Sequence, residues 1–175
     1  MSIDSLTSLE FISFLNSEGE LESQFDGKVG VYAIFDAEKT LQFVGYSRDV
    51  SLSLKQHLVR RPQQCYWIKV QTIDRPSRTV LEEIRAAWLA ENGSVPAGNS
   101  TDEVLWTQAI DAKVELTPAE RSSFAAGDEL IQMKLLKQVA RRVEANVMTQ
   151  LEARGVKMQI RFNPKLKESG LLDLK

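Results

Sequence analysis

Two short apolar runs, separated by a polar connection, constrain the fold of this chain more than any other feature. They are Val29–Phe35 and Leu41–Ser47, and residues 36–40 between them are polar. Runs rich in β-branched and aromatic residues, joined by a short polar loop, are typical of a β-hairpin. A helical pattern follows at once, at residues 49–59. The chain is therefore predicted to form a hairpin that leads directly into a helix.

The neighbouring segments complete a small α/β unit. Apolar residues at helical spacing predict a helix at residues 5–16, and the acidic segment 17–28 is expected to connect it to the hairpin. Residues 66–73 are rich in β-branched and aromatic side chains and predict a third strand. Helical periodicity returns at residues 79–91, and residues 94–100, with two glycine or proline breaks, interrupt it.

The remaining chain is predicted to be mostly helical. Thr117-Pro118 begins one helix, because threonine is a favoured N-cap and proline is tolerated at the first helical position. Apolar residues recur at helical spacing through residues 129–154 and predict a second, longer helix. Residues 156–162 alternate between apolar and polar side chains, which predicts a half-buried strand. Residues 163–175 are expected to form a tail.

Composition restricts the class of protein. The net charge is −2, but residues 134–175 carry ten Lys or Arg and four Asp or Glu, whereas residues 1–133 carry 12 basic and 20 acidic residues. Cys65 is the one cysteine, which excludes an intrachain disulfide and an all-cysteine metal site. No apolar run reaches the roughly 18–20 residues of a membrane span, and the N-terminus lacks the features of a signal peptide. We therefore expect a cytoplasmic protein with no membrane partner.

The hairpin carries a motif as well as a pattern. Gly30-Val31-Tyr32 and Phe43-Val44-Gly45, with ten residues between them, resemble the signature of the GIY-YIG nuclease superfamily. Together with Val95-Pro96-Ala97-Gly98-Asn99, they are similar to the GIY-YIG-like domain that is fused to plastid monothiol glutaredoxins, and to its stand-alone cyanobacterial relatives. The Cys-Gly-Phe-Ser element of those glutaredoxins is missing, so their thiol chemistry is not expected here.

The resemblance implies an α/β fold and a domain organisation. It predicts a small GIY-YIG-like three-stranded sheet with flanking helices at residues 29–100. A helix and a linker at residues 1–28 precede this domain. A helical extension with a C-terminal strand and a tail, at residues 101–175, follows it.

The resemblance also implies a catalytic site. Tyr32 matches the first motif tyrosine, His57 matches a histidine on the first helix, and Glu82 or Glu83 takes the place of a glutamate that binds Mg²⁺ or Mn²⁺. Which of the two glutamates would face the site is left open. Two further family positions are replaced: Phe43 stands for the second tyrosine and Ser53 for an arginine, and neither can do the same chemistry.

Two functions from different classes follow. The first is a divalent-metal-dependent DNA endonuclease with a degenerate site, for which DNA would be the partner. The second is a catalytically inactive GIY-YIG-fold protein that acts by binding, with a protein partner as one option. The residues also have a plainer interpretation, in which Tyr32 is a core tyrosine with its hydroxyl at the surface and His57 caps or packs near a helix end. Candidate nucleic-acid-binding residues are basic and lie after the hairpin or in the positive C-terminal segment: Arg48, Lys134, Lys137, Arg141 and Arg142.

Overall fold

The computed structural model describes residues 2–175 and divides them into two compact units, of which the first ends at Thr107 and the second runs from Gln108 to Lys175. The α/β fold class is confirmed. The first unit extends past the predicted limit at residue 100, because the segment after that residue packs against the hairpin and the first helix. The N-terminal segment also belongs to the first unit.

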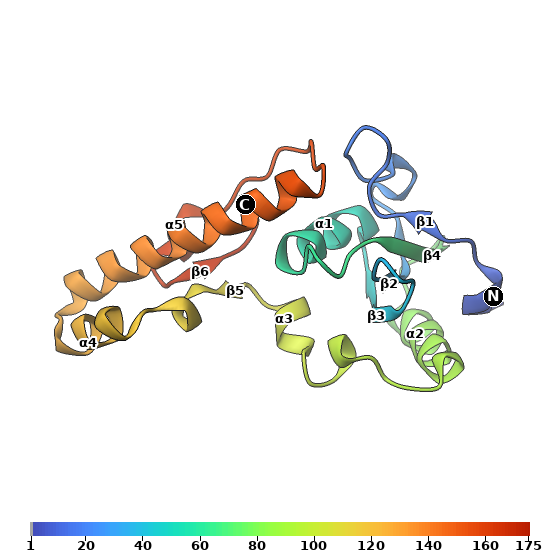
Figure 1. The fold of residues 1–175 in the computed structure, drawn as a ribbon. Helices are drawn as coiled ribbons and strands as arrows, with labels where there is room; N and C mark the ends of the chain where they lie inside the picture. Colours follow the sequence, from blue (N-terminus) through green and yellow to red (C-terminus); the bar gives the residue numbers. More distant parts are fainter. Residues whose placement is uncertain (1) are drawn as a thin grey trace. The chain divides into compact units, whose positions relative to one another are not determined.

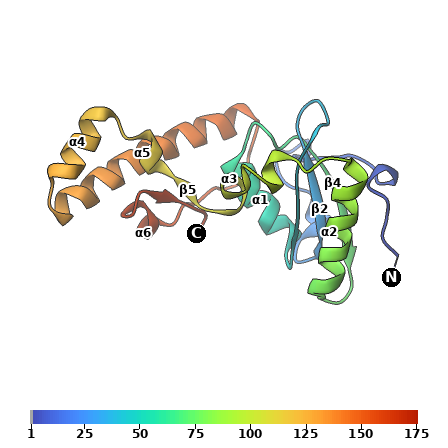
Figure 2. The ribbon, with the colours of Figure 1, turned by 90° about the horizontal axis from the view of Figure 1, so that it is seen from below.

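The first unit is built on a four-stranded antiparallel sheet with the strand order β1-β4-β2-β3. The helices α1 and α2 cover its two faces (Figures 1 and 2). In chain order the elements are η1 (Leu6–Ser8), β1 (Ile12–Ser13), η2 (Ser23–Phe25), β2 (Val29–Phe35), β3 (Leu41–Ser47), α1 (Val50–Arg60), β4 (Trp67–Ile73), α2 (Arg78–Asn92), η3 (Ala97–Asn99) and α3 (Glu103–Thr107).

The predicted hairpin is confirmed as β2 and β3. Tyr32 pairs with Gly45 and Ile34 with Phe43, so these four residues lie on the same face of the sheet. The connection is closed by Asp36, whose carboxylate accepts hydrogen bonds from the backbone N–H groups two and four residues later. The hairpin therefore presents the two motif positions, Tyr32 and Phe43, on the face that α1 covers.

The helices predicted at residues 49–59 and 79–91 and the strand predicted at residues 66–73 are also confirmed, and caps explain where the two helices begin. Asp49 begins α1, because its carboxylate accepts a hydrogen bond from the Leu52 N–H at 3.2 Å. Ser77 caps α2 in the same way, and Gly93 ends it at a φ of 83°, a left-handed conformation that glycine adopts without strain. The sheet face under α2 is lined by Val31 and Ala33, the neighbours of Tyr32.

The predicted helix at residues 5–16 is wrong. In its place the chain forms the short 3-10 helix η1 and the strand β1, which pairs with the outer edge of β4. The apolar residues that gave the helical spacing are used in different places, since Leu6 packs in the core under α2 and Phe11 lies against Phe35. Covering an otherwise unpaired sheet edge outweighs the local helical preference.

The N-terminal segment is fixed to α2 by one carboxylate. Glu91 accepts hydrogen bonds from the N–H groups of Leu6 and Thr7, each at 2.8 Å. We expect Glu91→Ala to speed hydrogen exchange at these two amides about tenfold, because hydrogen bonds to a charged acceptor are lost. Glu83→Ala, on the exposed surface of the same helix, is the matched control and is expected to leave exchange unchanged. Equal exchange in both variants would contradict the assignment.

The second unit is mainly helical. The strands β5 and β6 pair with each other in a second, two-stranded sheet. No helix within residues 2–175 is long and apolar enough to cross a membrane. In chain order the elements are β5 (Ile110–Asp111), η4 (Ala112–Glu115), α4 (Pro118–Ala126), α5 (Glu129–Ala153), α6 (Pro164–Lys167) and β6 (Leu171–Leu172).

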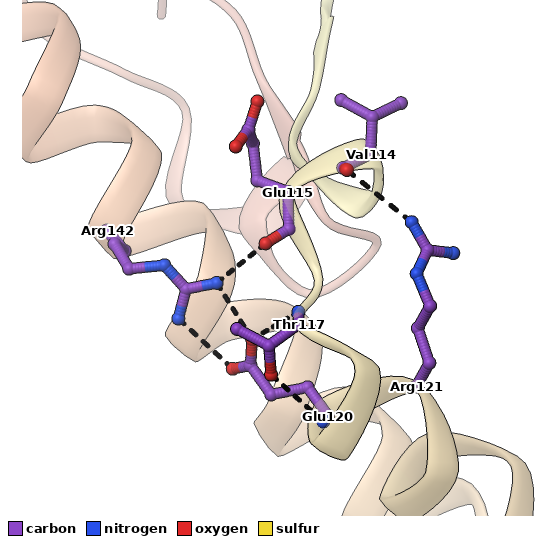
Figure 3. A network of polar contacts seen from close by, with 6 residues as sticks. All are labelled: Val114, Glu115, Thr117, Glu120, Arg121 and Arg142. Atoms are coloured by element: carbon purple, nitrogen blue, oxygen red, sulfur yellow. Dashed lines mark hydrogen bonds and ion pairs between the residues drawn. The ribbon is translucent and has the colours of Figure 1, made fainter.

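A polar network joins α4 to α5 (Figure 3). Arg142 on α5 donates two hydrogen bonds to the carboxylate of Glu120, at 2.8 and 3.1 Å, and a third to the carbonyl of Glu115. Glu120 also completes a capping box with Thr117 at the start of α4. The Arg142 guanidinium lowers the pKa of Glu120 to about 2. Arg142 therefore has a structural role within this unit.

Two predictions for the end of the chain are wrong in detail. Residues 156–162 do not form a strand: their side chains alternate in burial as predicted, but only Phe162 makes a bridge, to Leu174. Residues 163–175 are not a tail, since they fold into α6 and β6. Pro164 at the first position of α6, with Asn163 as its N-cap, is a local signal for that helix.

Candidate functional site

The two best-matched motif residues contact each other. The hydroxyl of Tyr32 on β2 lies 2.8 Å from Nε2 of His57 on α1, and the two atoms form a hydrogen bond. Only 3% of Tyr32 and 4% of His57 is exposed. Gly45 makes this packing possible, because a Cβ atom there would lie 2.7 Å from the Tyr32 hydroxyl. The predicted pair is thus brought together, but in the interior.

Two aromatic rings enclose the pair. Phe43 lies with its ring centroid 4.8 Å from that of His57, and Trp106 on α3 stacks on Phe43 at 5.2 Å with an interplanar angle of 3°. Trp106 is itself 2% exposed. One guanidinium nitrogen of Arg60 donates a hydrogen bond to the Trp106 carbonyl at 3.0 Å and thereby fixes α3 to α1. Solvent is consequently kept from the Tyr32 hydroxyl.

Burial also determines the charge state of the pair. It raises the pKa of the Tyr32 hydroxyl far above the ordinary value, although Ser53 and Arg60 act in the opposite direction. Burial and then the charge of Arg60 lower the pKa of His57 to about 3. Both side chains are therefore neutral at neutral pH. A neutral imidazole bonded to a neutral phenol cannot attract a phosphate.

The serine in the position of the family arginine forms hydrogen bonds to neighbouring side chains, Tyr32 among them. The Ser53 hydroxyl on α1 donates to the hydroxyl of Ser47 at 2.7 Å. Ser47 in turn donates to the carbonyl of Asp49, at the start of the helix. The polar atoms of this position hold the end of β3 to α1, and they supply no positive charge.

The two predicted metal ligands lie elsewhere. The Glu82 carboxylate on α2 accepts hydrogen bonds from Arg78 Nε at 2.8 Å and from the Tyr46 hydroxyl at 3.2 Å. Tyr46 packs with α2 on the sheet face opposite that of Tyr32. Glu83 is exposed. The structure therefore brings Tyr32 and His57 together, but it does not bring either glutamate to them.

The donor set around Glu82 does not suit a divalent cation. Mg²⁺ requires several oxygen ligands, usually including one or two carboxylates. Here one carboxylate is bonded to an arginine, which also lowers its pKa together with Tyr46. Within residues 2–175, no three His, Cys, Asp or Glu side chains gather in a group that could hold a metal. The residues present do not fit the Mg²⁺ or Mn²⁺ that the resemblance implies.

The Pro96–Asn99 match has a clear structural role. The side-chain amide of Asn99 accepts a hydrogen bond from the Val44 N–H at 2.8 Å and donates one to the Val44 carbonyl at 2.7 Å. It thus pairs with the outer edge of β3 as another strand would. Gly98 lies so close to this edge that a Cβ would approach the carbonyl of Gln42 to 2.3 Å. The element covers the free edge of β3, and the chain after it places Trp106 over Phe43.

The predicted nucleic-acid-binding residues differ in availability. In the second unit, Arg142 is held by Glu120, and Lys137 forms an ion pair with Glu168 at 3.5 Å. Lys134 and Arg141 are exposed on α5 and form no ion pair within residues 2–175. In the first unit, Arg48 is exposed just after β3 and lines a pocket. Two of the five predicted basic residues are therefore neutralised locally, and three are exposed.

The residues that cover the Tyr32–His57 pair and exclude solvent from it were not identified from the sequence. Trp106 lies beyond the predicted domain, and no periodicity at that position connects it with the hairpin. Arg60 comes one helical turn after His57, so helical spacing alone places it near the pair. Tyr46, the residue after Gly45, follows the motif directly, and its hydroxyl is the partner of Glu82.

Comparison with known proteins agrees with the plastid resemblance. The chain is 28% identical over 144 residues to the bifunctional monothiol glutaredoxin-S16, chloroplastic, of Arabidopsis thaliana. The match covers 78% of this chain and 47% of that protein, so the chain spans about half the length of the curated relative. No protein-family model matches the chain.

Proposed function

We propose that this chain contains a GIY-YIG-type domain that has no nuclease activity and acts by binding. The observation that carries the proposal is the enclosure of Tyr32 and His57 beneath Phe43 and Trp106. A general base must come within hydrogen-bond reach of the water that it activates. The Tyr32 hydroxyl instead bonds to His57 in a site that is closed to solvent.

The replaced residues support the same proposal. Phosphoryl-transfer catalysis depends on positive charge near the phosphate, and loss of one stabilising donor typically costs about 10²–10³ in rate. Ser53 and Phe43 remove two such groups, and Glu82 is engaged by Arg78. The replaced groups would all act on the same reaction, so their combined absence is expected to leave little catalysis to detect.

The activity named for the plastid relative is not carried over to this chain. Its name describes a bifunctional monothiol glutaredoxin, but the match covers about half of it. The single cysteine of this chain, Cys65, lies between α1 and β4 and is fully buried. A glutaredoxin-like thiol reaction requires an accessible thiolate, so that activity is not part of the proposal.

A plasmid-nicking assay tests the proposal. Wild-type protein, with Mg²⁺ or Mn²⁺ added, is expected to nick supercoiled DNA no faster than Tyr32→Phe or a Glu82→Ala/Glu83→Ala double variant, because none of them presents a base to an attacking water. Thermal unfolding checks that each variant is folded. Nicking by the wild type that both variants lose would establish the nuclease and overturn the proposal.

A further inference from the structure

The first unit has a pocket on the opposite side of the sheet from the Tyr32–His57 pair, and the proposed function does not involve it. It has a volume of about 350 Å³, which is at the lower end of the range for small-molecule sites. It lies where β3 ends and α2 begins, within the first unit. The lining residues are Val29, Tyr46, Ser47, Arg48, Pro76, Ser77, Arg78 and Leu81.

The polar lining of this pocket is cationic. It contains Arg48 and Arg78 and no aspartate or glutamate. Arg48 is exposed and forms no ion pair within residues 2–175, and Arg78 uses its Nε for Glu82 while its side chain is 82% exposed. The terminal nitrogens of two guanidinium groups therefore remain available. Guanidinium groups match the geometry of phosphate oxygens, with two parallel hydrogen bonds each.

Arg78 is held in place by one hydrogen bond, which leaves its guanidinium charged. Glu82 is bonded to Arg78 and to the Tyr46 hydroxyl, and the guanidinium of Arg85 lies 5.4 Å from the centroid of the Tyr46 ring. One carboxylate thus lies near two arginines, Arg78 and Arg85. Glu82, the predicted metal ligand, positions Arg78 and Tyr46 instead.

The rest of the lining is apolar. Val29, Pro76 and Leu81 contribute aliphatic surface, beside the ring of Tyr46. A bare inorganic anion would leave this surface uncovered, whereas an organic phosphate would place its carbon skeleton there. The Ser77 hydroxyl accepts the α2 cap hydrogen bond and still has its own proton to donate.

We propose that this pocket binds the terminal phosphate of an organic phosphate monoester, with the phosphate between Arg48 and Arg78 and the carbon skeleton against Val29 and Leu81. A free mononucleotide and the 5′-phosphorylated end of a nucleic acid both offer this chemistry. The inference rests on the proposed function, since it names the ligand class of a domain that acts by binding.

Calorimetric titration of the full chain tests the pocket. Adenosine monophosphate is the probe, and adenosine is its control without phosphate. Arg48→Gln and Arg78→Gln are each expected to weaken binding of the monophosphate by about tenfold or more, since each removes charge-assisted hydrogen bonds. Arg121→Gln, on α4, removes the same charge outside the pocket and is expected to leave affinity within about twofold. Thermal unfolding confirms that the variants fold.

The outcomes separate the two sources of the ligand. Phosphate-dependent binding of the monophosphate supports the pocket with a free nucleotide, whereas preference for a 5′-phosphorylated over a 5′-hydroxyl dinucleotide supports it with a nucleic-acid end. No binding of either phosphate at 1 mM ligand, about the weakest affinity of a specific site, overturns the inference. Binding that survives Arg48→Gln/Arg78→Gln, or inorganic phosphate that binds as tightly as the monophosphate, also overturns it.

Together with the nicking assay, the titration distinguishes failure of the proposed function from failure of the phosphate pocket. A wild type that nicks DNA and also binds the monophosphate through both arginines would overturn the proposed function and leave the pocket supported. A wild type that neither nicks DNA nor binds any phosphate probe would leave an inactive domain and overturn the pocket.

Discussion

Trp106→Ala is expected to lower the free energy of unfolding by about 3–5 kcal/mol, which is the usual cost of truncating a large buried aromatic side chain. The indole is 2% exposed and stacks on Phe43, so its removal leaves a cavity next to His57. Urea denaturation of the wild type and the variant measures the difference. Trp106→Phe, which keeps the stacking, is expected to lose clearly less.

The same variant tests whether Trp106 shields the site. His57 is the only histidine in the chain, so its reaction with diethyl pyrocarbonate can be followed without interference. The wild type is expected to be protected under native conditions, and Trp106→Ala to react while still folded. Reaction of wild-type His57 at the rate of free imidazole would contradict the enclosed site on which the proposed function depends.

The sequence predicts the middle of the first unit well, because local and tertiary signals agree there. Two apolar runs are joined by a short polar loop, and Asp49 and Ser77 are strong N-caps, so the hairpin, α1 and α2 follow from residues close together in the sequence. At residues 5–16 the signals disagree. Helical spacing is present, but the free edge of β4 and the carboxylate of Glu91 impose another conformation.

The site is less predictable than the fold for a similar reason. The motif places Tyr32 and His57 in one site, and the structure brings them together because β2 and α1 pack against each other. Whether the pair is open depends on Trp106, which is distant in sequence and carries no motif. The side of α2 on which Glu82 lies depends on the rotation of that helix over the sheet, and tertiary packing of Leu81 and Ile84 determines it.

The stability of the first unit is expected to fall as the pH drops below about 6.5. The unfolded chain binds a proton at His57 with a pKa near 6.5, whereas burial holds the pKa of the folded imidazole at about 3. Between these values the unfolded state holds the extra proton. The free energy of unfolding therefore decreases by up to about 1.4 kcal/mol for each pH unit lost. Urea denaturation at pH 7.5, 6.0 and 5.0 measures this slope.

A variant without the imidazole isolates the contribution of His57. His57→Gln retains a polar side chain near Tyr32 but does not titrate, so its stability is expected to change much less between pH 6.5 and 5.0. This window lies above the range in which carboxylates protonate, because unfolded glutamates titrate near about 4.3. The comparison uses slopes, so a constant loss of stability in the variant does not affect it. Parallel slopes in the two proteins, or imidazole NMR signals that titrate near pH 6.5 in the folded wild type, would mean that His57 is open to water, and the enclosed Tyr32–His57 pair would have to be abandoned.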